Sequence, residues 1–293
     1  MTYIKRITLF LMVNLGVLAL LSLLASLFGI TPYLQSSGLS LGSLLLYAAV
    51  MGFAGSIISL LLSKTMAKRT FKIQLISQPQ SSAELLVYST VQHIARKEGI
   101  TMPEVGIYPS AEVNAFATGY NRNKALVAVS QGLLDTMSPD EIEGVLGHEM
   151  AHILNGDMVT MTLLQGVVNT FVIFIARVIA YLLTAGRENA NSGAFYGISM
   201  VAELCLGLIA SLIVRWYSRR REYAADAGSA LFLGRDKMLS ALKRLKDLQR
   251  MVDTRQPSFA TLKISDRPNM FSRLFSTHPD IADRIAALEG YQR

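Results

Sequence analysis

The amino-acid sequence predicts a mainly α-helical protein with a small β-sheet, joined to two transmembrane hairpins. Hydrophobic residues make up 51% of the 293 residues and charged residues only 17%, whereas about a quarter of the residues in a soluble domain are charged. The apolar residues gather in four long segments, and short strand-like runs occur only between the second and the third of them. We therefore expect much of the chain to face lipid, with one soluble part between the hairpins and another after them.

The first hairpin is predicted by apolar segments over residues 7–30 and 39–62, within an N-terminal part of residues 1–70. Each segment is long enough to cross about 30 Å of hydrocarbon as a helix, and the first is too long for a signal peptide. Because Lys and Arg mark the cytoplasmic side of a membrane, we expect the N-terminus and the chain after the hairpin to be cytoplasmic. The basic residues at the two outer ends are Lys5, Arg6, Lys64, Lys68, Arg69 and Lys72.

The next part, residues 71–157, is expected to form a cytoplasmic α+β unit that ends in a metal-binding helix. Helical periodicity covers residues 83–97, and residues 105–108 and 125–130 are short apolar or alternating runs typical of strands. Residues 114–119 are a candidate third strand.

The last helix of this part has a strong start in Ser138-Pro139-Asp140-Glu141. Ser138 can cap the helix, Pro139 suits its first position, and Glu141 completes a capping box. We expect this helix to run on toward the membrane through Asp157.

Within that helix, His148-Glu149-Met150-Ala151-His152 matches the pattern H-E-x-x-H. Residues four apart share one helix face, so both imidazoles can bind one ion, and Glu149 can take a proton from a water at the open coordination position. The alternative is an amphipathic helix with two incidental histidines, but the chain has only four histidines in all. The single cysteine, Cys205, excludes a thiolate-rich site. The sequence therefore predicts one catalytic Zn²⁺ and a metalloprotease.

A second apolar hairpin is predicted within residues 158–214, with helices over 158–185 and 195–214. Arg177 interrupts the first helix near its far end, where it can snorkel to the interface. Glu203 lies deeper in the second, so we expect it to be paired, protonated or turned to a protein interior. The alternative, a hairpin of long helices that only skims the bilayer, stays open.

A catalytic zinc needs a third protein ligand. The extended pattern H-E-x-x-H-x-x-G-x-x-H fails, because Asn155 and Met158 occupy the Gly and final His positions. The ligand must therefore come from a distant residue. We expect the remaining residues, 215–293, to be a cytoplasmic C-terminal part with helices over 235–251 and 279–288 that supplies this ligand.

The candidates for the third ligand are His93, His278 or a carboxylate. Glu222 is favoured, because the second hairpin would return it to about the height of the histidines above the membrane. Asp226, one turn later on the same face, can accept a hydrogen bond from a ligand imidazole. Taken alone, two acidic residues at this spacing are more often a solvated helix face.

The chain resembles the HtpX family of bacterial heat-shock membrane proteases, which are glutamate-ligand zincins related to the CAAX prenyl proteases. The resemblance implies a zincin-like zinc endopeptidase of the inner membrane, with a cytoplasmic active site, that degrades damaged or misfolded membrane proteins in stress response and quality control. It also implies that Glu222 is the third ligand. The motifs that carry the resemblance are residues 114–119, 138–141, 155–157, 221–226 and 277–279, together with the zinc helix and the N-terminal hairpin.

The same resemblance suggests roles for further residues. The strand Asn114-Ala115-Phe116-Ala117 would be the sheet edge along which a peptide substrate lies extended. His278 and Asn114 would lie near the metal, where they can stabilise the tetrahedral oxyanion. The alternative for His278 is a structural position before Pro279, and we take His93 as structural.

The expected partners are protein substrates and the lipid bilayer. Nucleic acid is not expected despite the formal charge of +7, because the basic residues lie beside apolar runs and are not interleaved with aromatic residues. A structural zinc site would need a fourth protein ligand, and four helices with one or two buried charges are a poor plan for a solute transporter. A protease is therefore the favoured function.

Overall fold

The computed structural model describes residues 41–184, 192–255 and 278–290. The first predicted membrane helix, residues 7–30, and most of the loop at 186–194 lie outside the described residues. The contacts between residues divide the chain into two compact units, one from residues 1–59 and 162–211 and the other from 60–161 and 212–293. The helices are α3 (Leu41–Thr70), α4 (Ser82–Lys97), α5 (Gln131–Thr136), α6 (Pro139–Asn155), α7 (Asp157–Thr184), α8 (Ser192–Leu233), α9 (Arg235–Arg255) and α12 (Ile281–Glu289).

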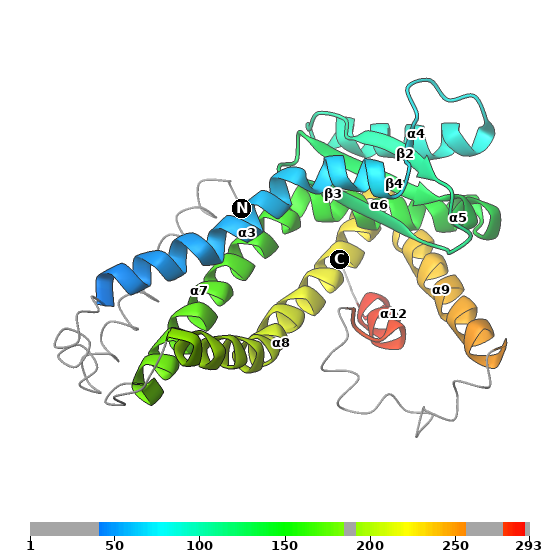
Figure 1. The fold of residues 1–293 in the computed structure, drawn as a ribbon. Helices are drawn as coiled ribbons and strands as arrows, with labels where there is room; N and C mark the ends of the chain where they lie inside the picture. Colours follow the sequence, from blue (N-terminus) through cyan, green and yellow to red (C-terminus); the bar gives the residue numbers. More distant parts are fainter. Residues whose placement is uncertain (1–40, 185–191, 256–277, 291–293) are drawn as a thin grey trace. The chain divides into compact units, whose positions relative to one another are not determined.

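The second unit contains one mixed sheet of four strands in the order β1-β2-β4-β3 (Figure 1). β2 and β4 are parallel, and the two outer pairs are antiparallel. β3 pairs only with β4 and is therefore an edge strand, with no strand on its outer side among the described residues. The strands are β1 (Gln74–Leu75), β2 (Glu104–Tyr108), β3 (Ala115–Gly119) and β4 (Ala125–Ser130).

The expected fold class, mainly α-helical with a small sheet, is confirmed. Helix 83–97 and the three expected strands are found within one residue of their predicted bounds, and Ser138 forms the capping box with Glu141. The pattern missed β1 and α5. β1 has only two residues, both exposed, and so offers no alternation to detect.

The core of this unit lies between one face of the sheet and helices α4 and α6. Val91 and Ile94 of α4, Val127 of β4, and Leu146 and Met150 of α6 are each fully buried there. Burial of this kind stabilises a fold by about 25 cal/mol per Å² of apolar surface. A smaller apolar cluster joins α9 to α12. These contacts hold α6, which carries the predicted metal ligands, rigidly against the sheet.

The expectation that the metal-binding helix runs on through Asp157 is wrong. α6 ends at Asn155, and Gly156 adopts a left-handed conformation with a φ of 66°. A left-handed residue ends the helical hydrogen-bond ladder, and glycine takes this conformation without steric cost. α7 starts anew at Asp157, so the zinc motif and the membrane segment belong to separate helices.

Three described helices, α3, α7 and α8, are long and apolar enough to cross a membrane. α3 was expected to end at residue 62 but continues to Thr70, and α8 continues from its apolar part to Leu233. Lys and Arg are good helix formers, so the loss of hydropathy marks the end of the apolar segment and not the end of the helix. The count of four membrane helices stays a prediction, because the first lies outside the described residues.

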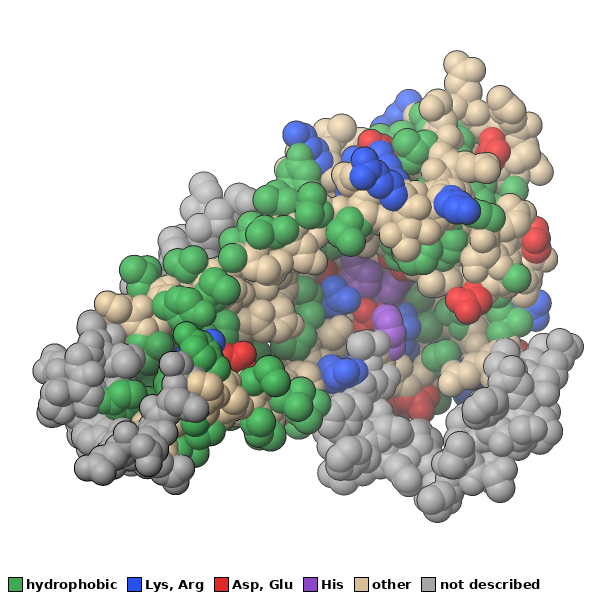
Figure 2. Space-filling view, in the orientation of Figure 1, with side chains coloured by type: hydrophobic (Ala, Val, Ile, Leu, Met, Phe, Trp, Pro, Cys, Tyr) green, Lys and Arg blue, Asp and Glu red, His purple; other side chains and the backbone are tan. Residues whose placement is uncertain are grey.

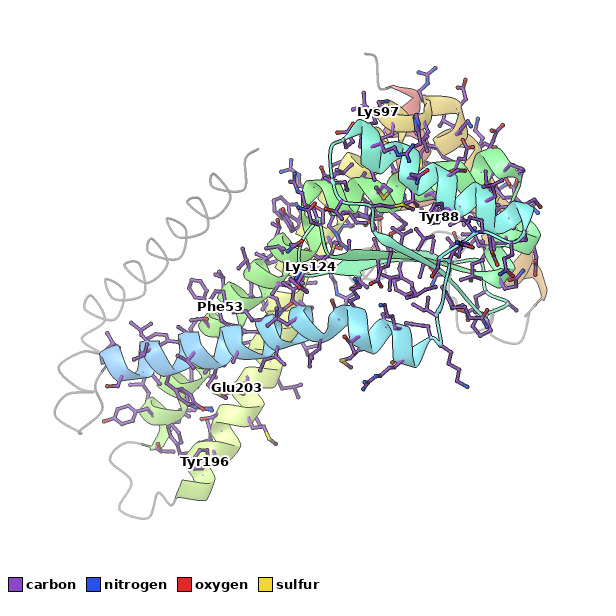
Figure 3. All side chains as sticks on the ribbon, turned by 90° about the horizontal axis from the view of Figure 1, so that it is seen from above. Phe53, Tyr88, Lys97, Lys124, Tyr196 and Glu203 are labelled. Atoms are coloured by element: carbon purple, nitrogen blue, oxygen red, sulfur yellow. The ribbon has the colours of Figure 1, made fainter. Side chains whose placement is uncertain are left out.

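Within the first unit, α3 and α7 pack closely through small residues. A Cβ atom at Gly52 would lie 2.6 Å from the backbone nitrogen of Thr170, and one at Gly166 would meet the ring of Phe53, which is labelled in Figure 3. Of the three alternatives for Glu203, the structure shows pairing, since its Oε1 accepts a hydrogen bond of 2.7 Å from Nη1 of Arg177. The pair joins α7 to α8 within their apolar stretches.

Candidate metal centre

The two histidines of the H-E-x-x-H motif lie on one buried face of α6. His148 and His152 are each 7% exposed, and their Nε2 atoms are 3.1 Å apart. Glu222 of α8 is fully buried beside them, with its carboxylate oxygens 3.4 Å from Nε2 of His152 and 3.5 Å from Nε2 of His148. One ligand atom from each residue falls within 4.8 Å of the others. The structure thus brings together the three residues that the sequence analysis selected as metal ligands.

α8 reaches α6 because small residues line the crossing. A Cβ atom at Gly147 would lie 2.5 Å from Oγ of Ser229, and that hydroxyl donates a hydrogen bond of 2.7 Å to the carbonyl oxygen of Gly144. Glu222 lies two helical turns before Ser229 on α8. The close packing of α8 on α6 at Gly147 therefore places the Glu222 carboxylate next to the two histidines.

Both imidazoles are oriented by carboxylates at Nδ1. Nδ1 of His148 lies 2.8 Å from Oδ1 of Asp226, and Nδ1 of His152 lies 2.6 Å from Oδ2 of Asp157. An Nδ1–H that donates to a carboxylate leaves the Nε2 lone pair for a metal, which is the usual arrangement around metal-bound histidines. The lone pairs of both rings therefore point at the same place.

The donor set fits a metal ion. Two Nε2 lone pairs at 3.1 Å repel each other unless a cation or a proton lies between them. Oε1 of Glu222 is buried and has no hydrogen-bond partner among the described residues, and a buried polar atom without a partner is costly. A cation at this point satisfies all three groups, and two imidazoles with one carboxylate and an open position suit a catalytic zinc.

Without the ion, the same carboxylates favour protonation of the rings. Burial lowers the pKa of His152, but the hydrogen bond to Asp157 and the nearby Glu222 carboxylate outweigh it and raise the pKa to about 9. Burial likewise lowers the pKa of His148, and its bonds to Asp226 and Glu222 raise it above its ordinary value. An anionic cluster that binds protons this firmly also attracts a divalent cation.

Glu149 lies next to the three candidate ligands in a recessed position that solvent still reaches. Burial raises the pKa of Glu149, while the two histidines and the backbone amide of Ala117 act in the opposite direction. The Ala117 amide belongs to the edge strand β3. The carboxylate is therefore held between the metal centre and the edge of the sheet, where a peptide group can meet it.

The residues before and within β3 were expected to be a substrate strand. The amide of Ser130 donates a hydrogen bond of 2.9 Å to the carbonyl oxygen of Asn114, at the start of the antiparallel ladder. Because inward and outward pairs alternate along such a ladder, the amides and carbonyls of Ala115 and Ala117 point to the open edge. Phe116 lies between them, with its backbone turned to β4.

The other two predicted site residues differ in their placement. Nδ1 of His278 lies 2.8 Å from Oε2 of Glu222, so the structure brings His278 to the metal centre. Asn114 is exposed, and its backbone amide and carbonyl are hydrogen-bonded to Ser130 and not to the candidate ligands. His93 lies on the exposed face of α4, apart from the metal-binding group.

Two residues of the centre were missed by the sequence reasoning. Asp157 holds His152, and its only local signal is its place at the start of a new helix after an Asn-Gly turn. Arg284 of α12 is 7% exposed and donates to both oxygens of Asp226, at 2.8 Å from Nε and 2.6 Å from Nη2. Its Nη1 lies 3.8 Å from Oε2 of Glu222. No motif near Arg284 in the sequence predicts its contacts with Asp226 and Glu222.

In the space-filling view, histidine side chains appear at the bottom of a hollow, beside acidic and basic side chains (Figure 2). The described centre therefore combines two histidines and a glutamate with a ring of charged partners. This arrangement can hold a divalent cation and present a carboxylate base to a peptide on the neighbouring strand.

Comparisons with known proteins agree with this geometry. The chain matches peptidase family M48 over residues 81–292. It is similar to "Protease HtpX homolog" of Thiobacillus denitrificans, at 50% identity over 98% of this chain and 100% of that protein, and to "Protease HtpX" of Tolumonas auensis, at 52% identity over 97% and 98%. Among solved structures, Ste24p of S. mikatae matches with a TM-score of 0.63 and 22% identity, over 92% of this chain and 64% of that one. The chain therefore spans less than two thirds of Ste24p, and that likeness concerns the fold alone.

Proposed function

The chain belongs to peptidase family M48 and is a multi-pass membrane metalloprotease, and from this premise we propose that it is a zinc-dependent endopeptidase. The observation that carries the proposal is the convergence of His148, His152 and Glu222 on one point, with Glu149 beside them. The proposed ligands are these two imidazoles and this carboxylate, and the proposed catalytic base is Glu149.

Zinc, when bound, polarises the scissile carbonyl and makes water acidic enough to be deprotonated near neutral pH. The protein supports this chemistry by holding its donors in place. Asp226 and Asp157 fix the tautomers of His148 and His152, and Arg284 fixes Asp226. We assign these three charged residues a positioning role.

Glu149 performs the proton transfers in this proposal. Its carboxylate accepts a proton from the attacking water and then donates that proton to the amine nitrogen of the departing peptide. Burial raises the pKa of Glu149, which makes the carboxylate a better base than an exposed glutamate. A peptide that adds to β3 through the outward amide of Ala115 and the outward carbonyls of Ala115 and Ala117 would lie directly beside this carboxylate, which itself accepts a hydrogen bond from the amide of Ala117.

We propose His278 as the group that stabilises the oxyanion. Its contact with Glu222 is supporting evidence, because it keeps the imidazole at the metal centre. Oε2 of Glu222 contacts Nδ1 of His278, and Oε1 remains for the metal. Asn114 remains a second proposal for the same role, and it requires the exposed Asn114 side chain to turn toward the metal when substrate binds.

The location and the physiological substrates are also proposals. We place residues 71–157 and 215–293 in the cytoplasm and the apolar helices in the bacterial inner membrane, because the basic residues beside the first hairpin favour this orientation. A peptidase whose chain continues from the metal helix into membrane helices is suited to damaged or misfolded membrane proteins. The relatives named as HtpX proteases support such a stress-related role.

The test compares the wild-type protein with Glu149→Gln, both purified in detergent and loaded with zinc, on casein and on an unfolded membrane protein. We expect cleavage by the wild type, inhibition by chelators, and equal zinc content without cleavage in Glu149→Gln. Glu98→Gln, at the exposed end of α4, is the matched control and should cleave like the wild type. Equal rates for the wild type and Glu149→Gln would refute the proposed mechanism.

A further inference from the structure

We propose that Phe71, Tyr108 and Phe116 form an aromatic shelf that selects a large apolar side chain of the substrate at one position of the bound peptide. The proposal rests on the peptidase function proposed above and adds to it a specificity site. The three rings pack against one another in the second unit, with centroids 5.4 Å apart for Phe71 and Tyr108, 5.2 Å for Phe71 and Phe116, and 5.7 Å for Tyr108 and Phe116.

The shelf has a buried base and an accessible rim. Tyr108 is only 3% exposed, whereas Phe71 is 45% exposed and Phe116 is partly exposed. Large aromatic side chains usually bury most of their surface, so an accessible aromatic rim beside a candidate active site is a binding surface for apolar groups. The area that Phe71 and Phe116 leave open is available to a substrate side chain.

The register of the sheet places the shelf next to the substrate strand. Phe116 pairs with Ala128 and lies on the same face as Tyr108, whereas Ala115 and Ala117 face the core toward α6. Because neighbouring residues of a strand alternate between faces, Phe116 points to the face opposite the metal helix. Ala128, the cross-strand partner of Phe116, is small and so leaves room for the rings beside it.

A peptide that adds to the outer edge of β3 has the same alternation. Its residues opposite Ala115 and Ala117 face α6 and the metal centre, while the residue opposite Phe116 faces the shelf. The shelf therefore acts on one side chain, that of the residue opposite Phe116. The peptide backbone binds without regard to sequence, and the shelf adds the selectivity.

The chemistry of the face favours an apolar side chain over a charged one. Strands β2, β3 and β4 contain a single charged residue, Glu104, and Glu104 is already paired with Lys64 and Lys68. A charged substrate side chain laid on the shelf would lose water and find no opposite charge on these strands. Leu, Met and Phe side chains bury apolar area there at no such cost. The shelf thus suits unfolded segments of membrane proteins, in which apolar side chains are frequent.

The test measures cleavage of peptides by the full-length, zinc-loaded protein in detergent. Each position within four residues of the cleaved bond is varied in turn to Phe, Leu, Ala and Asp, and kcat/KM is determined. We expect a preference of roughly tenfold for Phe or Leu over Ala at one position, with Asp the poorest. In Phe71→Ala this ratio should fall below about twofold, and in Phe71→Leu it should largely remain. The matched control Leu85→Ala removes an apolar side chain of α4 that is more exposed than Phe71, at 57% against 45%, and should keep the wild-type ratio.

The outcomes separate the shelf from the function on which it rests. Cleavage that depends on Glu149 but shows no apolar preference at any position would overturn the shelf and leave the peptidase intact. An unchanged preference in Phe71→Ala and Phe116→Ala would do the same. If Phe116→Ala fails to fold, Phe71→Ala decides the matter alone, since Phe71 lies outside the strands. Equal cleavage by the wild type and Glu149→Gln would overturn the peptidase function and the shelf together.

Discussion

Replacing Arg284 by Gln should weaken metal binding although Arg284 is not a ligand. Arg284 donates two hydrogen bonds to Asp226, at 2.8 Å and 2.6 Å, and both residues are at least 93% buried. In Arg284→Gln, Asp226 keeps only His148 as a partner for its buried negative charge. The Asp226 side chain is then no longer held in one rotamer, and the His148 ring that it contacts is no longer held in one orientation.

Two magnitudes follow from this geometry. Breaking a buried ion pair by removing one partner costs about 3–5 kcal/mol of folding stability. Loss of a group that orients a metal ligand lowers metal affinity by about 10–100-fold. Arg284→Lys restores the charge but not the fork that meets both carboxylate oxygens, so it should fall between the wild type and Arg284→Gln in both measurements.

The assay determines zinc affinity by competition with a chelator of known affinity, at a temperature at which circular dichroism shows each variant to be folded. The matched control is Lys243→Gln, which removes an exposed ion pair between α9 and α12, the contact of 3.6 Å to Glu289. Surface pairs of this kind contribute little, so Lys243→Gln should bind zinc like the wild type. Wild-type zinc affinity and stability in Arg284→Gln would refute the reasoning.

A double-mutant cycle sharpens the test. If Arg284 acts through Asp226, the double variant Arg284→Gln/Asp226→Asn should cost little more than Asp226→Asn alone, because the two residues form one unit. Additive losses of zinc affinity would show instead that Arg284 acts by a separate route, for example through its weaker contact with Glu222.

Three further predictions concern other parts of the molecule. Glu222→Gln should lower zinc affinity by well over tenfold while leaving the fold intact, and stoichiometric, tight zinc in this variant would show that another residue is the third ligand. The pKa of His152 is about 9 without metal, so below that pH zinc must displace a proton, and the apparent zinc affinity should rise as the pH increases from 7 to 9. Calorimetry in two buffers of different ionisation enthalpy should detect the released proton. A zinc affinity that does not change between pH 7 and 9 would contradict this prediction. Gly156→Ala should destabilise the protein by about 1–2 kcal/mol, since φ is 66° there, and an unchanged melting temperature would argue against the left-handed turn.

The fold and the centre could be predicted from the sequence where the determinants are local. The capping box at Ser138, the short apolar run of β4 and the histidine spacing on α6 are each set by residues close together in the sequence, and each is found in the structure. The apolar segments gave the membrane helices but not their ends, because α3 and α8 continue as helices into charged sequence.

The remainder depends on contacts between distant residues. Arg284 is 58 residues from Asp226, and only the packing of α12 brings them together, so no spacing rule can find the pair. Gly156 was read as part of a continuous helix, because a single glycine is tolerated within helical patterns and its conformation depends on the residues around it. The resemblance to a known family supplied the roles of His278 and β3, which the pattern of residues alone does not contain.

The contacts of α12 have a consequence for the assembly of the metal centre. His278 and Arg284 reach the centre on Glu222 and Asp226, and both belong to the described segment that packs on α9 through an apolar cluster. Their polar contacts therefore form only once that segment has docked. A copy of the protein in which α12 is undocked would keep all three candidate ligands and Glu149, but it would lack the groups that hold Asp226 and Glu222 in place. Docking of α12 thus couples completion of the fold to activity.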